Sequence, residues 1–120
     1  MGADAPARLR TVLIAHEASY PDPIRVRAGD PVRLSGAAEI WDGHRWLWAA
    51  AADGREGWMP DDLVETAGGE AVAAADYSAL ELSCVPGERL ACLAERHGWA
   101  LCRNAAGGEG WVPARNLAPR

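Results

Sequence analysis

The chain of 120 residues has 49% hydrophobic and 24% charged residues, a composition typical of a globular protein, and it contains no apolar run long enough for a membrane span. The formal net charge of −5, with arginine as the only strongly basic residue, argues against nucleic acid as a partner, because phosphate binding needs an excess of positive charge. Residues 1–6 have neither a basic start nor an apolar stretch, so no secretory signal is expected and we predict a cytoplasmic bacterial protein.

Short β-prone segments separated by turn residues follow one another along the chain. In the first half they are residues 12–14, 24–26, 32–34, 46–48 and 58–59, with turns at 29–30, 42–43 and 53–54. In the second half they are 82–84, 90–92, 99–102 and 111–112. Residues 61–63 and 114–117 have room only for a single 3₁₀ turn, and no stretch holds a helical period with caps. We therefore expect an all-β protein.

The chain contains an internal sequence repeat with two copies. Residues 54–60 and 107–113 share the pattern Gly-x-x-Gly-Trp-x-Pro, and the same offset carries Trp46 onto Trp99. The first glycine of each motif lies between two expected strands, where a tight hairpin turn requires a positive φ. The repeat restricts the range of possible folds, and its residues include no catalytic group.

The repeat predicts two small domains, each near the lower size limit for independent folding. We expect them at residues 8–65 and 71–118, joined by a short, flexible linker at 66–70. The first copy holds extra residues between its Gly-Asp turn and Trp46 that the second copy lacks. The short linker implies that the two domains are neighbours in space.

The order of the motifs resembles the Src homology 3 (SH3) domain, present twice. Residues 73–77 are similar to the Ala-Leu-Tyr-Asp-Tyr motif of that family, and residues 81–84 to its acidic-Leu-Ser-Phe motif. Trp99 matches the tryptophan that opens the third strand, and residues 111–114 match the Trp-x-Pro-Ser that follows. The resemblance implies two small five-stranded SH3-like β-barrels in tandem, closest in pattern to bacterial variants of the domain.

The resemblance also implies a function for the second copy. SH3 domains bind extended proline-rich peptides along an aromatic groove, and acidic side chains beside the groove take an arginine or lysine of the ligand. Carried over residue by residue, the groove of the second copy is expected to consist of Tyr77, Trp99 and Pro113, with Glu81 as the acid and Trp111 beside the specificity pocket.

Both copies depart from the family pattern at the other wall of the groove. Ala75 stands where the first tyrosine of the opening motif belongs, and Asn116 and Leu63 stand where the final groove tyrosine belongs in the two copies. The connection from Tyr77 to Leu82 is also short compared with the first long loop of the family. At least one proline pocket is therefore expected to be shallow or missing.

Two alignments compete for the opening motif of the first copy. Spacing to Ile24 puts His16 at the position of the second motif tyrosine, whereas similarity of residues 18–20 to 75–77 favours Tyr20. We lean towards Tyr20 as the functional equivalent of Tyr77.

The rest of the first groove is retained, and its expected residues are Trp46, Trp58 and Pro60. Asp22 or Glu17 is expected to supply the acid. Trp41 lies among the extra residues, where it either adds contact surface to the groove or packs against the second domain. We favour packing, since small paired domains gain most from a shared interface.

Cysteine and histidine residues offer little support for an enzyme or a metal site. Cys84, Cys92 and Cys102 fall at inward strand positions of the second copy, where they are expected to pack as buried thiols. The odd count and the expected reducing compartment argue against a disulfide, although strand pairing would permit one. The histidines are scattered, so we expect no catalytic residue, no metal and no cofactor.

These observations favour a non-catalytic protein-interaction module that binds protein or peptide ligands through degenerate grooves and exists as a monomer or a weak dimer. Affinity at each groove is expected to be weak, because the truncated aromatic walls offer few hot spots. Alternatives are a structural or assembly subunit with covered grooves, which buried Trp46 and Trp99 would support, and a cell-wall-associated binding module.

Overall fold

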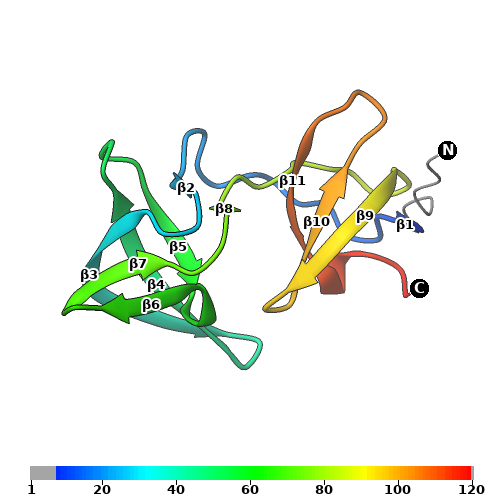
Figure 1. Ribbon diagram of the computed structural model, residues 1–120. Coiled ribbons are helices and arrows are strands. Elements are labelled where there is room, and N and C mark those ends of the chain that lie inside the picture. Colours follow the sequence, from blue (N-terminus) through cyan, green and yellow to red (C-terminus); the bar gives the residue numbers. More distant parts are fainter. Residues whose placement is uncertain (1–7, 120) are drawn as a thin grey trace, which may run out of the picture. The chain divides into compact units, whose positions relative to one another are not determined.

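The computed structural model describes residues 8–119, which form strands and two 3₁₀ turns but no α-helix (Figure 1). In chain order the strands are β1 (Arg8–Thr11), β2 (Arg25–Val26), β3 (Pro31–Trp41), β4 (His44–Ala51), β5 (Glu56–Pro60), β6 (Val64–Ala67), β7 (Glu70–Ala73), β8 (Tyr77–Ser78), β9 (Arg89–Arg96), β10 (Trp99–Arg103) and β11 (Glu109–Pro113). The 3₁₀ turns are η1 (Asp61–Leu63) and η2 (Ala114–Asn116), both where the sequence predicts them. The all-β class is confirmed. Across residues 8–119 no helix has the length and hydropathy needed to cross a bilayer.

The chain divides into two compact units that differ from the consecutive ranges 8–65 and 71–118 expected from the repeat. Unit 1 consists of residues 8–19 together with 81–119, and unit 2 consists of Tyr20–Leu80. Each unit therefore takes its opening segment from one sequence copy and the rest of its strands from the other. The boundaries of the two compact units therefore differ from the boundaries of the two sequence repeats.

Unit 1 is built on a four-stranded sheet with the order β1-β9-β10-β11. The opening strand of the first copy, β1, pairs antiparallel with β9 of the second copy, from Arg8 opposite Cys92 to Thr11 opposite Arg89 (Figure 1). An isolated bridge from Val12 to Leu117 continues this contact beyond the strand. The N-terminal segment thus completes a sheet whose other strands lie far away in sequence.

Unit 2 contains a five-stranded sheet with the order β5-β4-β3-β7-β6 and a two-stranded sheet of β2 and β8. Here β7 and β8 come from the second copy, and β7 pairs with both β3 and β6 (Figure 1). Residues 66–70, expected as a flexible linker, instead form the β6–β7 hairpin. Its turn holds Gly68 and Gly69 at φ of 60° and 83°, which residues with a side chain rarely adopt.

The strand ladders of both units remain open, so the closed barrels expected from the sequence are not present. In the part of the chain that the structure describes, the unit 1 sheet ends at β1 and β11 and the main unit 2 sheet at β5 and β6. Isolated bridges, such as Val12 to Leu117, replace the closing ladders. The strands of the described residues therefore form three separate sheets, one in unit 1 and two in unit 2.

Each unit has its own hydrophobic core, and each core includes a residue from the exchanged segment. The unit 1 core consists of Val12, Leu82, Cys84, Leu90, Ala100, Cys102, Val112 and Leu117, with Cys92 at its margin. In unit 2, Ile24 and Met59 are fully buried, and Ala73 of β7 is also buried. Burial of a valine or leucine side chain contributes about 1.5–3 kcal/mol, so loss of Val12 and β1 together removes a large share of the stability of a small unit.

The exchange predicts which truncations fold. Removal of residues 20–80 and connection of Ser19 to Glu81 by a short Gly/Ser linker should leave a folded unit 1, because these ends already lie close together: the Ser19 amide is 3.4 Å from Glu81 Oε1. A well-dispersed amide NMR spectrum and a cooperative thermal transition would be the expected result.

The matched control is the repeat-based fragment 71–118, which lacks β1 and Val12 although it contains the whole second copy. We expect it to remain unfolded, with a collapsed amide spectrum. A cooperative transition for this fragment, or an unfolded joined variant, would contradict the assignment of β1 to unit 1.

Candidate functional site

The outer face of β4 and β5 in unit 2 carries a band of aromatic rings. In the antiparallel register Trp46 lies opposite Pro60 and Trp48 opposite Trp58, so these four side chains share one face of the hairpin. The alternate residues face the core, where Met59 is fully buried. The Trp48 and Trp58 rings meet edge to face with centroids 5.1 Å apart.

Two more rings extend this band at its ends. Tyr20 lies edge to face on Trp48 at 5.7 Å, and Trp41 contacts both Trp58 at 5.7 Å and Trp46 at 5.9 Å. Trp41 comes from the tip of the long β3–β4 hairpin, which is formed by the extra residues of the first copy. Trp41 therefore contacts aromatic residues of its own unit.

The aromatic side chains of this band differ in exposure. Trp41 is 38% exposed and Tyr20 is 43% exposed, whereas Trp46 is only 5% exposed. Pro60, the other expected groove residue, is also among the fully buried side chains. The groove wall predicted at Trp46 and Pro60 is thus covered, and Trp41 forms part of the exposed surface in its place.

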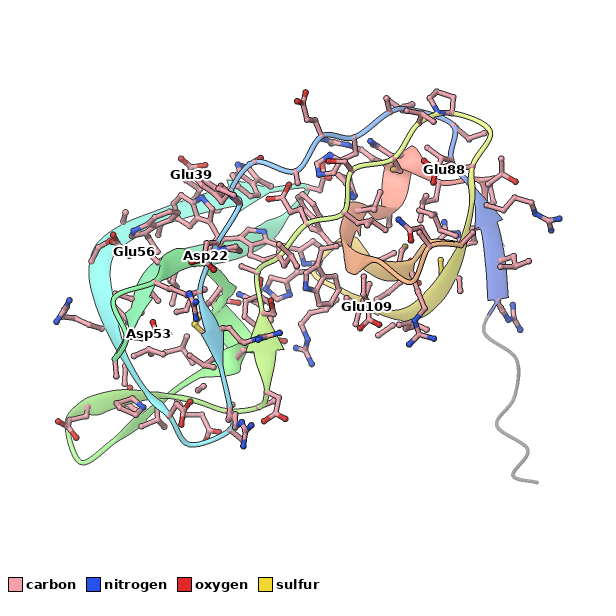
Figure 2. All side chains as sticks on the ribbon, turned by 90° about the horizontal axis from the view of Figure 1, so that it is seen from above. Asp22, Glu39, Asp53, Glu56, Glu88 and Glu109 are labelled. Atoms are coloured by element: carbon pink, nitrogen blue, oxygen red, sulfur yellow. The ribbon has the colours of Figure 1, made fainter. Side chains whose placement is uncertain are left out.

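Three acidic residues of unit 2, Asp22, Asp53 and Glu56, make polar contacts (labelled in Figure 2). The indole N–H of Trp48 donates to Glu56 Oε1 at 2.9 Å. Asp22, one of the two acids expected to take a ligand cation, instead accepts from Arg55 at 3.0 Å, and Asp53 pairs with the same guanidinium at 3.2 Å. The hydrogen bond and charge of Asp22, followed by the charge of Asp53, raise the pKa of Arg55. Asp22 is therefore already engaged by a cation of its own unit.

The candidate site of unit 1 is a compact group of a histidine, an acid and a tryptophan. The imidazole N–H of His16 donates to Glu81 Oε1 at 2.8 Å, and both side chains are 15% exposed. The His16 ring meets Trp99 edge to face at 5.4 Å. The same carboxylate oxygen lies 3.4 Å from the amide nitrogen and the hydroxyl of Ser19. Trp99 and Trp111 are both partly exposed.

The second glycine of each repeated motif has a steric role that the sequence pattern alone does not reveal. A Cβ on Gly110 would lie 2.7 Å from the carbonyl carbon of Glu81 and 2.8 Å from the amide nitrogen of Leu82. A Cβ on Gly57 would lie 2.9 Å from Ile24 Cγ2. These glycines let another segment of the unit approach the sheet edge closely. In unit 1 that segment carries Glu81, and the amide of Leu82 donates to the carbonyl of Trp111 at 3.0 Å.

The first glycine of each motif has the expected turn conformation, with φ of 90° at Gly54 and 89° at Gly107. No atom lies within 4 Å of a Cβ built at either position, so backbone conformation and not space selects glycine here. The two glycines of Gly-x-x-Gly therefore serve different purposes, one for the turn and one for close packing.

The structure regroups the residues predicted for the two grooves. Unit 1 holds Glu81, Trp99, Trp111 and Pro113, and unit 2 holds Tyr20, Trp46, Trp58, Pro60 and Tyr77. Tyr77 was expected beside Trp99, but it pairs with Val26 of unit 2 and donates its hydroxyl to the carbonyl of Trp58 at 3.0 Å. The exchange of opening segments between the copies is the cause.

The strand register also decides between the two alignments of the first copy. Cys84 is the counterpart of Val26, and the bridge from His16 to Cys84 corresponds to the pairing of Tyr77 with Val26. His16 is therefore the structural counterpart of Tyr77, as spacing to Ile24 indicates, and Tyr20 lies on Trp48 instead. Sequence spacing contained the correct signal, and local similarity of residues 18–20 was misleading.

Sequence comparison finds one family similarity, and it falls on the first copy. Residues 12–67 match the family model of the variant SH3 domain. The matched range spans both contact units, because residues 12–19 belong to unit 1 and the remainder to unit 2. SH3-type domains are in general non-catalytic modules of protein interaction, which is the class of function that the match supports. No curated protein and no solved structure is significantly similar to the chain.

Substitution of Gly110 by alanine should destabilise unit 1 by about 1–3 kcal/mol, the usual cost of overpacking, because the new Cβ must displace backbone and not a flexible side chain. Urea denaturation monitored by tryptophan fluorescence would measure the loss. At the same time the shift of residues 81–82 should disturb the His16–Glu81 contact, visible in the His16 ring signals by NMR.

Gly108→Ala is the matched control two residues away, since its new Cβ would meet only the side chain of Asn104, at 3.1 Å. This variant should lose much less stability. Equal stability of the two variants would contradict the steric role assigned to Gly110.

Proposed function

We propose that the chain is a non-catalytic protein-interaction module of two SH3-like units, in which unit 1 binds an extended, proline-rich peptide beside Trp99. The observation that carries this proposal is the contrast between the two groove tryptophans. Trp99 is partly exposed and contacts His16, the partner of Glu81, whereas Trp46 is only 5% exposed and contacts Trp41. A proline ring packs on an exposed indole face at little entropic cost, which a covered indole does not permit.

Glu81 supports a preference for a peptide with an arginine or lysine beside its prolines. Its carboxylate is bonded to His16, whose ring contacts Trp99, and its exposure of 15% lets it interact with a cation in a partly desolvated environment. The interaction is expected to be modest, because His16 already uses one carboxylate oxygen.

Affinity at unit 1 should be weak for a second reason. His16 occupies the position that Tyr77 has in unit 2, and Asn116, the residue at the final tyrosine position, is buried at 7% exposure and donates its amide to the Ala15 carbonyl at 3.3 Å. The second wall of the groove therefore offers few aromatic contacts, and few hot spots limit the binding free energy.

Unit 2 has a specific observation in favour of a structural or assembly role. Trp46 is 5% exposed and in ring contact with Trp41, and Asp22 is engaged by Arg55. We propose that this groove is closed by its own hairpin and that unit 2 mainly supports the module.

A titration of the ¹⁵N-labelled full chain with a synthetic peptide containing an Arg-x-x-Pro-x-x-Pro sequence tests both proposals. The indole N–H signals of Trp99 and Trp111 should shift, with a Kd in the range from tens of micromolar to millimolar, about −4 to −6 kcal/mol. The signal of Trp46 should not move. Replacement of the peptide arginine by a neutral residue should weaken binding by about fivefold or less, as for a partly exposed ion pair.

Two variants serve as controls for this titration. Trp99→Ala should abolish the shifts while the unit 2 signals stay folded, and Trp41→Ala should uncover Trp46 and allow new shifts there. If no NMR signal around Trp99 shifts with any peptide of a proline-rich panel, the proposal that unit 1 binds such peptides is wrong. Shifts at Trp46 in the unmodified chain would contradict the closed groove of unit 2.

A further inference from the structure

Two of the three cysteines are direct partners across neighbouring strands of unit 1. Cys92 of β9 lies opposite Cys102 of β10 in the antiparallel register, and their sulfur atoms are 3.9 Å apart. All three cysteines are free thiols in the structure. Their sequence spacing gives no hint of this contact, which depends on the strand pairing alone.

The geometry is close to what a disulfide requires. Directly opposed residues in an antiparallel pair have Cα atoms about 4.5–5.5 Å apart, within the range of about 4.4–6.8 Å found for disulfides. The sulfur atoms would have to approach from 3.9 Å to about 2.05 Å. The register shifts between Leu101 and Cys102, and such a bulge gives the strand a local bend and twist that can accommodate this change.

The two thiols differ in access, which sets the order of reaction. Cys102 is fully buried, and Cys92 is partly exposed at the margin of the core. Burial, followed by the neighbouring Cys92, raises the pKa of Cys102 to about 12. A reagent from solution therefore meets Cys92 first, and Cys102 is held in place as the second thiol.

We propose that Cys92 and Cys102 form a dithiol site that is converted to an intramolecular disulfide by exchange with a low-molecular-weight disulfide such as glutathione disulfide. The Cys92 thiolate attacks one sulfur of glutathione disulfide, the glutathione S–S bond breaks, and one glutathione leaves and takes up a proton. The Cys102 thiol then loses its proton and attacks the Cys92 sulfur of the mixed disulfide, which releases the second glutathione. Two electrons and two protons pass from the protein to glutathione disulfide.

Cys84 is excluded from this pair by its place in the backbone. It lies outside β9 and β10. Its amide donates to the carbonyl of His16 at 2.9 Å, and its carbonyl accepts from the amide of His16 at 3.0 Å. The proposed cross-link instead joins β9 to β10, the strand that begins at Trp99. Because Cys92 is partly exposed, a thiol from solution can attack the bond at its sulfur, so the site acts reversibly.

Tryptic mapping of the full chain provides a direct test, because Arg89, Arg96 and Arg103 separate the cysteines. Cys92 falls in peptide 90–96, Cys102 in 97–103 and Cys84 in 56–89. After treatment of the folded protein with glutathione disulfide near pH 8, acid quenching and alkylation in denaturant, we expect a mass loss of about 2 Da before alkylation. Peptides 90–96 and 97–103 should be linked, Cys84 should be alkylated, and dithiothreitol should reverse the link.

Two variants sharpen this experiment. Cys84→Ala should form the disulfide as the unmodified chain does, and Cys102→Ala should trap glutathione on Cys92 with a mass gain of about 305 Da. A link to peptide 56–89, or a stable glutathione adduct on Cys92 of the unmodified chain, would overturn the proposal. So would three alkylated cysteines after treatment. The map of the unmodified chain decides the question even where a variant fails to fold.

Discussion

The antiparallel pairing of β1 with β9 is the contact on which unit 1 depends. It brings Val12 into a core with Leu90 and Leu117, three side chains that are 3% exposed or less. Without β1 the edge of β9 would present unpaired backbone groups and the core would lose one of its walls. The same holds in unit 2 for β7, which lies between β3 and β6 and cannot be removed without separating them.

A short connection offers a physical reason for the exchange. In each copy the opening strand must turn through a loop before it meets the next strand of the same copy. Only Ala79 and Leu80 lie between β8 and Glu81. Two residues are too few for a long loop that folds the chain back onto its own opening strand. Short hinge loops favour the exchange of equivalent elements, and two copies in one chain provide the equivalent partner without any need for a second molecule. Pro21 and Pro23 stiffen the corresponding connection of the first copy.

Local sequence predicts the elements of this fold well and their pairing poorly. The turns at Gly54 and Gly107, the 3₁₀ turns and the inward cysteines 84 and 102 follow from residue types and alternation. These signals extend over a few residues only. The choice of β9 as the partner of β1 depends on loop length and long-range packing, and both opening segments are short enough to fit either sheet. The regrouping of Tyr77 and His16 was therefore missed, although the spacing from His16 to Ile24 already indicated the correct register.

The same constraint explains why the two candidate grooves differ. In unit 1 the segment that carries Glu81 approaches Gly110 closely, and the exchanged N-terminal segment supplies His16, which bonds Glu81 and contacts Trp99. Unit 2 has an equivalent close approach of Ile24 to Gly57. There the long β3–β4 hairpin adds Trp41, whose ring contacts Trp46. A duplicated motif thus fixes the scaffold in both units, while residues outside the motif decide whether its tryptophan is accessible. The extra residues of the first copy, visible in the sequence as a change of repeat offset, supply Trp41, a ring that the second copy lacks.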